Sequence, residues 1–195
     1  MSDNQYFMLE DAPDYLDVFP VLKGRQVLGC GQFSVVFEGR GGKRGTVYKL
    51  TCDEGYKDFI INHAGTPGLP RFATLHGELD CEQGLCWLIE LPRLVDLADD
   101  DMILEREAVI NAVTYRINAW EKFNGIEDSQ HLMAEALKQV GDCNLFSSDT
   151  KQALNAMSVY MRNTKHDLLL DLTTRDNFMT DGHRLIITDP FVTVF

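Results

Sequence analysis

The stretch that decides the fold is VLGCGQFSVVFE, Val27–Glu38. Its valines and phenylalanines are typical of β-strands, and Gly29 and Gly31 interrupt it near the middle. A glycine-rich turn at Gly39–Gly42 and a second apolar run, Thr46–Leu50, follow directly. This stretch therefore predicts an antiparallel hairpin with a glycine-rich loop in its first half.

The next elements extend this hairpin into a larger sheet. Asp53–His63 predicts a short helix, because its apolar side chains recur on one stripe. Two further strand-like runs, Phe72–Leu79 and Leu85–Leu91, flank a turn at Glu82–Gly84 and predict a second hairpin.

After Leu91 the spacing of apolar residues changes from the alternation typical of strands to the three-to-four-residue spacing typical of helices. The segments expected to be helical are Met102–Phe123, Ser129–Val140 and Thr150–Asn163. The apolar stripe expected on the first consists of Ile103, Ile110, Val113, Ile117 and Trp120. The acidic triplet Asp99–Asp101 suits the N-terminus of the first, where the helix dipole favours negative charge. Ser148 or Asp149 is expected to cap the third.

The last part of the chain returns to short apolar runs. Leu168–Leu170 and Leu185–Ile187 are expected to be strands, Asp181-Gly182 a turn, and Phe191–Phe195 a last strand or a segment that packs into a partner. Strands followed by helices predict an α+β fold.

Composition excludes several classes of protein. The 195 residues carry 18 Lys and Arg against 30 Asp and Glu, a net charge of −12, which argues against general nucleic-acid binding. No apolar run approaches the ~20 residues of a membrane span, and Met1–Tyr15 does not resemble a signal peptide. The five cysteines form no C-x-x-C pair. We therefore expect a cytoplasmic protein whose acidic surface attracts basic partners.

The glycine-rich hairpin is the first chemical signal. The run Gly29–Val36 fits the pattern G-x-G-x-x-S-x-V, in which backbone without Cβ can approach a phosphate closely. A strand follows it rather than a helix, which argues against a dinucleotide-binding fold. Lys49 lies on the next strand, where its ammonium would neutralise phosphate charge, and Asp58 or Glu54 would hold it. A bulged hairpin and an exposed lysine remain the structural alternatives.

The second signal lies near the other end of the chain, in DLTTRDNFM, Asp171–Met179, and LIITDP, Leu185–Pro190. Asp171 suits the carboxylate that orients an acceptor hydroxyl. Asn177 and Asp189 offer the hard oxygen ligands that Mg²⁺ prefers. A strand, a turn and a second strand would bring these two ligands together.

In these motifs the chain resembles the protein-kinase-like superfamily, in the form found in small phage-encoded and bacterial proteins. The resemblance implies a two-lobed fold, with an antiparallel-sheet lobe at 1–92 and a minimal, truncated helical lobe at 93–195. It implies ATP and Mg²⁺, with Lys49 and Asp171 as catalytic residues and Asn177 and Asp189 as metal ligands. The residues implied to bind the nucleotide are Gly29, Gly31, Ser34, Val36, Lys49, Glu90 and Leu91, with Ile89 as gatekeeper.

The chain also departs from the family pattern. Five residues, not four, separate Asp171 from Asn177, so Asp176 is an alternative ligand. Pro92 lies near the position whose N–H meets adenine and has no N–H, so that Leu91 or Arg93 would serve instead. Only six residues follow Asp189, which leaves no activation segment or peptide-docking helices if the sequence is complete.

Two functions follow from these matches and departures. The preferred one is an ATP-dependent phosphotransferase of Ser/Thr type that modifies proteins, including host proteins if the chain is encoded by a phage. The alternative is a catalytically weak or inactive kinase-like module that regulates a host protein by direct contact.

Overall fold

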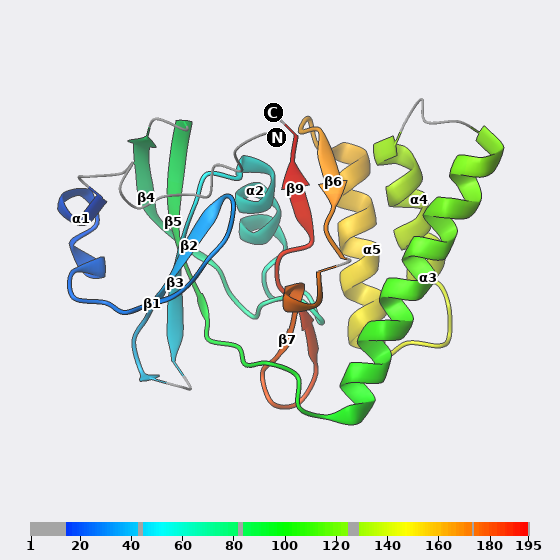
Figure 1. Cartoon of the computed structure of the whole chain (residues 1–195), viewed down its shortest axis with the longest axis horizontal. Coiled ribbons are helices and arrows are strands. Elements are labelled where there is room, and N and C mark those ends of the chain that lie inside the picture. The colour runs from blue at the N-terminus through cyan, green and yellow to red at the C-terminus, as the bar shows by residue number, and fades with distance from the viewer. Residues whose placement is uncertain (1–14, 43–44, 82–83, 125–128, 173, 195) are drawn as a thin grey trace, which may run out of the picture. The chain divides into compact units, whose positions relative to one another are not determined.

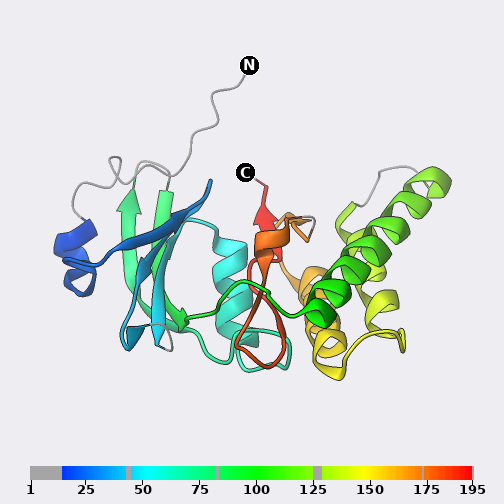
Figure 2. The same ribbon diagram turned by 60° about the horizontal axis from the view of Figure 1, so that its bottom comes forward.

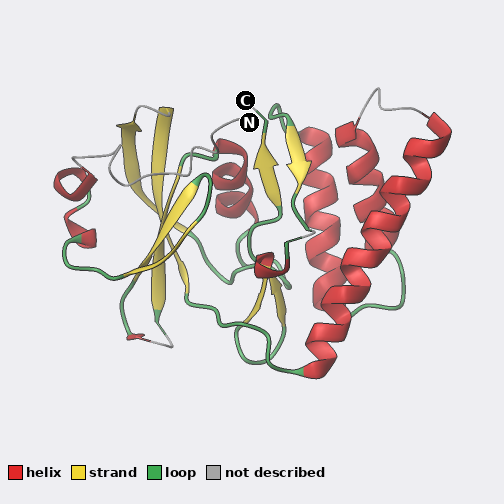
Figure 3. Ribbon diagram, in the orientation of Figure 1, coloured by secondary structure: helices red, strands yellow, loops and turns green. Residues whose placement is uncertain are grey.

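The computed structural model describes residues 15–42, 45–81, 84–124, 129–172 and 174–194. Most of the N-terminal stretch and part of the turn before Gly84 therefore lie outside the described residues. The chain divides into two compact units, which we call unit 1 (Met1–Ile61 with Phe72–Arg93) and unit 2 (Asn62–Arg71 with Leu94–Phe195). Strands form most of unit 1, and helices form much of unit 2 (Figure 1, Figure 3). The predicted α+β fold class is confirmed.

Unit 1 contains one antiparallel sheet with the strand order β1-β2-β3-β5-β4. Both predicted hairpins are present, and the sheet joins them by pairing β3 with β5. The strands are β1 (Val27–Cys30), β2 (Ser34–Glu38), β3 (Thr46–Thr51), β4 (Thr74–Cys81) and β5 (Gly84–Pro92).

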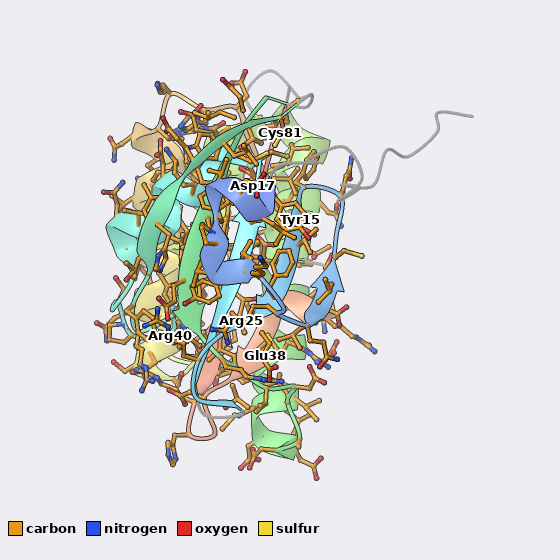
Figure 4. All side chains as sticks on the ribbon, turned by 90° about the vertical axis from the view of Figure 1, so that its left-hand side faces the viewer. Tyr15, Asp17, Arg25, Glu38, Arg40 and Cys81 are labelled. Carbon is orange, nitrogen blue, oxygen red and sulfur yellow. The ribbon has the colours of Figure 1, made fainter. Side chains whose placement is uncertain are left out.

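One face of this sheet is covered by a segment that the sequence analysis missed. This segment contains α1 (Tyr15–Val18) and the 3-10 turn η2 (Pro20–Leu22), and its Phe19 and Leu22 are buried with Phe37 and Tyr48 of the sheet. Figure 4 shows the segment lying across that face, with Arg25, Glu38 and Arg40 toward one end of the sheet and Cys81 at the other. The helical spacing of Tyr15, Phe19 and Leu22 is a sequence signal that could have found it.

The opposite face of the sheet packs on α2 (Glu54–His63). Tyr56 and Ile60 are buried against Ile89 and Leu91 of β5, as the predicted apolar stripe requires. The carboxylate of Asp53 accepts a hydrogen bond from the Tyr56 backbone N–H, which caps the first turn of this helix.

Unit 2 contains α3 (Asp100–Asn124), α4 (Ser129–Gly141) and α5 (Ser148–Asn163), and α4 packs along α5 (Figure 2). The expected cap of α5 was wrong: Ser147 is the N-cap, and its hydroxyl accepts the backbone N–H of Thr150. The Asp99 carboxylate accepts the first N–H groups of α3, so the acidic triplet lies at a helix N-terminus as predicted.

The expected buried stripe of α3 was only partly right. Val113 is buried as predicted and is joined by Val109, whereas Trp120 is 37% exposed. None of the helices in the described part of the chain combines the length and the apolar character that a bilayer crossing requires.

Two short strand pairs complete unit 2. They are β6 (Leu168–Leu170) with β9 (Phe191–Thr193), and β7 (Phe178–Thr180) with β8 (Leu185–Ile187). The predicted last strand is thus β9, paired within its own chain. The Ile187 N–H donates to the Gly68 carbonyl, which ties segment 62–71 to β8 and explains why this segment belongs to unit 2.

Candidate functional site

The segment between β6 and β7 carries the first group of expected functional residues. It runs from Asp171 through the 3-10 turn η4 (Arg175–Asn177) into β7. The Asp171 N–H donates to the Pro190 carbonyl at 2.8 Å, just beyond the β6–β9 ladder. Asp171 is therefore held beside the segment that contains Asp189.

Asn177 connects the same two segments from the other side. Its side-chain amide N–H donates to the Asp171 carbonyl at 2.6 Å, and its own backbone carbonyl accepts the Thr188 N–H at 2.8 Å. The amide oxygen consequently points away from Asp171. Asn177 is buried, whereas the alternative ligand Asp176 is exposed. The backbone of Asn177 and that of Thr188, which precedes Asp189, lie side by side, as the strand–turn–strand argument predicted.

The carboxylate of Asp171 has a hydroxyl partner that the sequence analysis missed. The Thr174 Oγ1 donates to Asp171 Oδ1 at 2.8 Å, and Thr174 itself is exposed. A hydroxyl side chain three residues after an aspartate is a common local hydrogen-bonding pattern, which is the signal that sequence reasoning could have used.

Two side chains from the helices of unit 2 contact this loop or the strand that leads into it. Gln130 of α4 donates to the Met161 carbonyl at the end of α5 and accepts the Leu168 N–H at the start of β6. The guanidinium of Arg175 lies 3.3 Å from the carboxylate of Glu107 on α3. Neither contact has a sequence signal, since each joins elements tens of residues apart.

In unit 1, Lys49 lies in the middle of a row of cross-strand neighbours. It is paired with Val36 on β2 and with Ile89 on β5, so these three side chains share one face of the sheet. Lys49 is 7% exposed, and its ammonium lies 3.7 Å from the centre of the Tyr56 ring. This cation–π contact on α2 was not expected from the sequence.

The two acidic residues considered as partners of Lys49 lie together on α2, with carboxylate oxygens within 4.8 Å of each other. The Asp58 carboxylate is also 2.6 Å from the ammonium of Lys57, a neighbour on the same helix. Glu54 lies in the first turn of α2, directly after the helix-capping Asp53. Because one carboxylate can accept from two ammonium groups, the ion pair with Lys57 does not choose between them, and both remain candidates.

The glycine-rich loop is a tight hairpin. The Gly31 N–H donates to the Ser34 carbonyl at 2.8 Å and closes the turn between β1 and β2. A Cβ built on Gly29 or Gly31 would meet nothing within 4 Å, and neither residue has a left-handed backbone conformation. Neither packing nor strain within the described residues explains these glycines, and the open space above them suits a ligand that approaches the backbone.

The two expected adenine-contacting residues lie in β5. The Glu90 side chain points to the face opposite Lys49, where its carboxylate lies 2.8 Å from His76 Nε2. Burial would raise the pKa of Glu90, but hydrogen bonds from His76 and Thr46 and the charges of His76 and Arg40 outweigh it and lower this pKa. The side chain of Glu90 is therefore occupied within the sheet.

The backbone beyond Glu90 does not distinguish between the expected adenine donors. The Arg93 N–H donates to the Gly45 carbonyl at 3.0 Å, continuing the pairing of β3 with β5. Leu91 is paired with Val47 two residues earlier in the same ladder, so its N–H also points at β3. Pro92 has no N–H to offer.

The expected site residues thus form two sets, each within one compact unit. Unit 2 contains Asp171, Asn177 and Asp189, and hydrogen bonds hold their backbone segments together. Unit 1 contains the other set. There Val36 and Lys49 are cross-strand neighbours on β2 and β3, and the glycine loop connects β1 to β2. The members of the second set are Gly29, Gly31, Ser34, Val36, Lys49, Glu90 and Leu91.

Comparisons with known proteins give a weak resemblance. No family model matches this chain. No curated protein matches it. Among solved structures, a thermostable mutant of aminoglycoside phosphotransferase APH(4)-Ia, in ternary complex with AMP-PNP and hygromycin B, is similar with a TM-score of 0.41 and 17% identity, over 94% of this chain and 72% of that chain. A second structure of aminoglycoside phosphotransferase APH(4)-Ia gives a TM-score of 0.40 and 18% identity, over 96% of this chain and 74% of that chain. Because these scores and identities are low, the proposals below rest on the residues of this chain.

Proposed function

We propose that this chain is an ATP-dependent phosphotransferase with a protein-kinase-like fold. The observation that carries the proposal is the pair of hydrogen bonds made by Asn177, one to the Asp171 carbonyl and one from the Thr188 N–H. They join the backbone segments of Asp171, Asn177 and Asp189, whose side chains offer the two carboxylates and the amide oxygen that phosphoryl transfer uses.

In this proposal Asp171 orients the acceptor hydroxyl and takes its proton. Asn177 and Asp189 would hold Mg²⁺, because amide and carboxylate oxygens are the hard ligands that this ion prefers. The ion would neutralise charge on the phosphates of ATP. The hydrogen bond from the Asn177 amide to Asp171 keeps the amide oxygen oriented before any ligand arrives.

The ATP phosphates would bind along the glycine hairpin and Lys49. The open space beside Gly29 and Gly31 supports this assignment, since no neighbouring atom would stop a phosphate from approaching the backbone of the hairpin. The Tyr56 ring lies against the Lys49 ammonium and restrains the long lysine side chain before ATP binds. Binding of ATP would therefore cost less side-chain entropy. The half-exposed Ser34 and Val36 lie on the same face as Lys49.

Adenine would lie against the Glu90–Leu91 stretch of β5, with Ile89 as the neighbouring gatekeeper. The N–H groups of Leu91 and Arg93 both point at β3, so an adenine contact there would use other atoms of this stretch. The acceptor is a Ser or Thr hydroxyl of a protein, and the net charge of −12 favours a basic partner.

A thermal-shift titration with ATP and Mg²⁺ tests this function. Ligand at 100 times its dissociation constant stabilises a protein by ~2.7 kcal/mol, so a rise in melting temperature is expected. Lys49→Met should abolish the rise, and Lys23→Met, at an exposed lysine in the same unit, should retain it. ADP release measured in parallel reports turnover. If millimolar ATP with Mg²⁺ produces neither a shift nor ADP, the phosphotransferase is refuted and the binding-module alternative gains support.

A further inference from the structure

The Thr174 hydroxyl is hydrogen-bonded to the carboxylate of Asp171, the proposed catalytic base. Its Oγ1 is 2.8 Å from Asp171 Oδ1 and donates to it, which is the contact that a general base makes with the hydroxyl it deprotonates. The side chain is exposed, on the turn just before η4. A reacting phosphate could therefore approach this hydroxyl from solvent.

The position of Thr174 in its loop is also fixed. Its carbonyl accepts the Asn177 N–H at 3.1 Å, and the following residue, Arg175, contacts Glu107 on α3. The hydroxyl is thus held on the loop that joins the proposed base to the proposed metal ligand Asn177.

We propose that Thr174 is an autophosphorylation site, modified within its own chain. This inference rests on the proposed phosphotransferase function and names the first acceptor of that activity. Thr174 Oγ1 attacks the γ-phosphorus of ATP, and the bond from that phosphorus to the bridging oxygen breaks. Asp171 takes the hydroxyl proton, ADP leaves, and the products are phosphothreonine at position 174 and ADP.

Phosphate at Thr174 also has a consequence for the base. The hydrogen bond to Asp171 disappears, because the phosphorylated oxygen no longer carries a proton. A group with a charge of about −1.5 to −2 then lies next to a carboxylate, and the two repel. Phosphorylation of Thr174 therefore displaces the carboxylate from its present contact, and further transfer slows.

The experiment uses the full chain incubated with ATP and Mg²⁺, and it measures the intact mass and the fragment spectrum of the phosphopeptide. One phosphate per chain is expected, on Thr174 and not on the adjacent Thr173. Thr174→Val should remove it and Thr174→Ser should retain it, since serine keeps the hydroxyl. Ser148→Ala, which removes an exposed hydroxyl elsewhere in unit 2, should leave the modification unchanged.

A mixing experiment separates reaction within one chain from reaction between chains. Wild-type protein is incubated with isotopically labelled Asp171→Asn protein, which retains Thr174 but has no base. The labelled chain should stay unmodified, and the rate constant for the wild type should not depend on protein concentration. Phosphate on Thr174 of the labelled chain would overturn the intramolecular reaction.

The outcomes also separate this inference from the proposed function. If ATP shifts the melting temperature and ADP forms while Thr174 stays unmodified, the autophosphorylation site is wrong and the phosphotransferase stands. If ATP neither binds nor turns over, the phosphotransferase itself fails. Thermal melts of Thr174→Val and Thr174→Ser without ATP should match the wild type, because the side chain is exposed.

Discussion

The glycine hairpin of unit 1 and the Asp171–Asn177 loop of unit 2 differ in what surrounds their expected functional residues. In the hairpin, hydrogen bonds to the Ser34 and Phe33 carbonyls hold the turn, and a Cβ on Gly29 or Gly31 would meet open space. In the loop, the buried Asn177 bonds backbone groups of Asp171, Thr174 and Thr188. Both turns are held by hydrogen bonds, but the hairpin leaves room beside its glycines, whereas the central side chain of the loop is buried.

This difference indicates which substitutions change stability and which change ligand binding. Residues that hold the loop should affect both, because removing them leaves buried polar groups or cavities behind. The glycines of the hairpin should affect binding alone. Each prediction below tests one part of this contrast.

The largest effect is expected from the buried side chains of the β7–β8 pair, which follows the loop. Leu185→Ala on β8 removes a side chain that is 3% exposed, so it should lower the free energy of unfolding by about 2–5 kcal/mol. Leu169→Ala on β6 is the matched control: the side chain is 43% exposed, and the change should stay within about 0.5 kcal/mol. Denaturant unfolding measures both. Equal losses would show that burial of Leu185 does not stabilise unit 2.

The next effect concerns the hydrogen bond that joins the loop. Asn177→Leu keeps the side chain's approximate size but leaves the partly buried Asp171 carbonyl without its donor, which should destabilise the protein by about 1 kcal/mol or more. Phosphate transfer should be lost as well, because a proposed metal ligand is gone. Asn111→Leu, at an exposed position on α3, should leave both transfer and melting temperature nearly unchanged. If Asn177→Leu transferred phosphate at the wild-type rate, the Asn177 side chain would not be a ligand in the proposed site.

The glycines of unit 1 offer a test within a single sheet. Gly39→Ala should destabilise the protein by about 1–3 kcal/mol, since its Cβ would lie 2.3 Å from the Thr46 carbonyl oxygen. Gly29→Ala and Gly31→Ala should leave the melting temperature unchanged and weaken the ATP-induced shift. Calorimetry with and without ATP measures both quantities. Unaltered ATP binding in both variants would show that the open space is not a phosphate site.

The smallest effect is expected at Glu90, and it depends on pH. The pKa of Glu90 is lowered in the folded protein, so its stabilising contribution is present above its unfolded pKa and is lost as pH falls through the folded value. Glu90→Gln should therefore be less stable than the wild type near neutral pH, and this difference should shrink in acid. Unfolding measured from pH 7 down to pH 3 tests the sign. ATP binding should not change, because the side chain contacts His76 on the opposite face from Lys49.

Much of the architecture was accessible from the sequence because it depends on local patterns. The alternating apolar residues of β2 and the helical stripe of α5 identify these elements without reference to the rest of the chain. The exceptions have causes that lie outside the local pattern. Ser147, not Ser148 or Asp149, caps α5, since several adjacent residues could serve and tertiary contacts select one. Trp120 continues the stripe of α3 but is exposed, because the stripe does not determine how much of the helix is covered.

Part of the candidate site could be predicted from the sequence. Residue type and order identified Asp171, Asn177, Asp189 and Lys49 as candidates, and their catalytic roles remain predictions. The sequence could not identify Tyr56 as the ring beneath Lys49, nor Gln130 as the bridge between α5 and β6. These contacts join side chains from different elements, and no spacing pattern describes such pairs.

The amino-acid sequence specifies which chemical groups the protein contains and their order along the chain. It also predicts most of the strands and helices, because these follow from short-range sterics and hydrophobic periodicity. Which of these groups form hydrogen bonds with one another depends on the tertiary structure. It directed the Asn177 amide onto the Asp171 carbonyl, joined the Asp171 N–H to the Pro190 carbonyl, and occupied the Arg93 N–H. Hydrogen bonds at 2.6–2.8 Å depend on positions set by the packing of the whole unit, and such positions are not encoded in any local stretch.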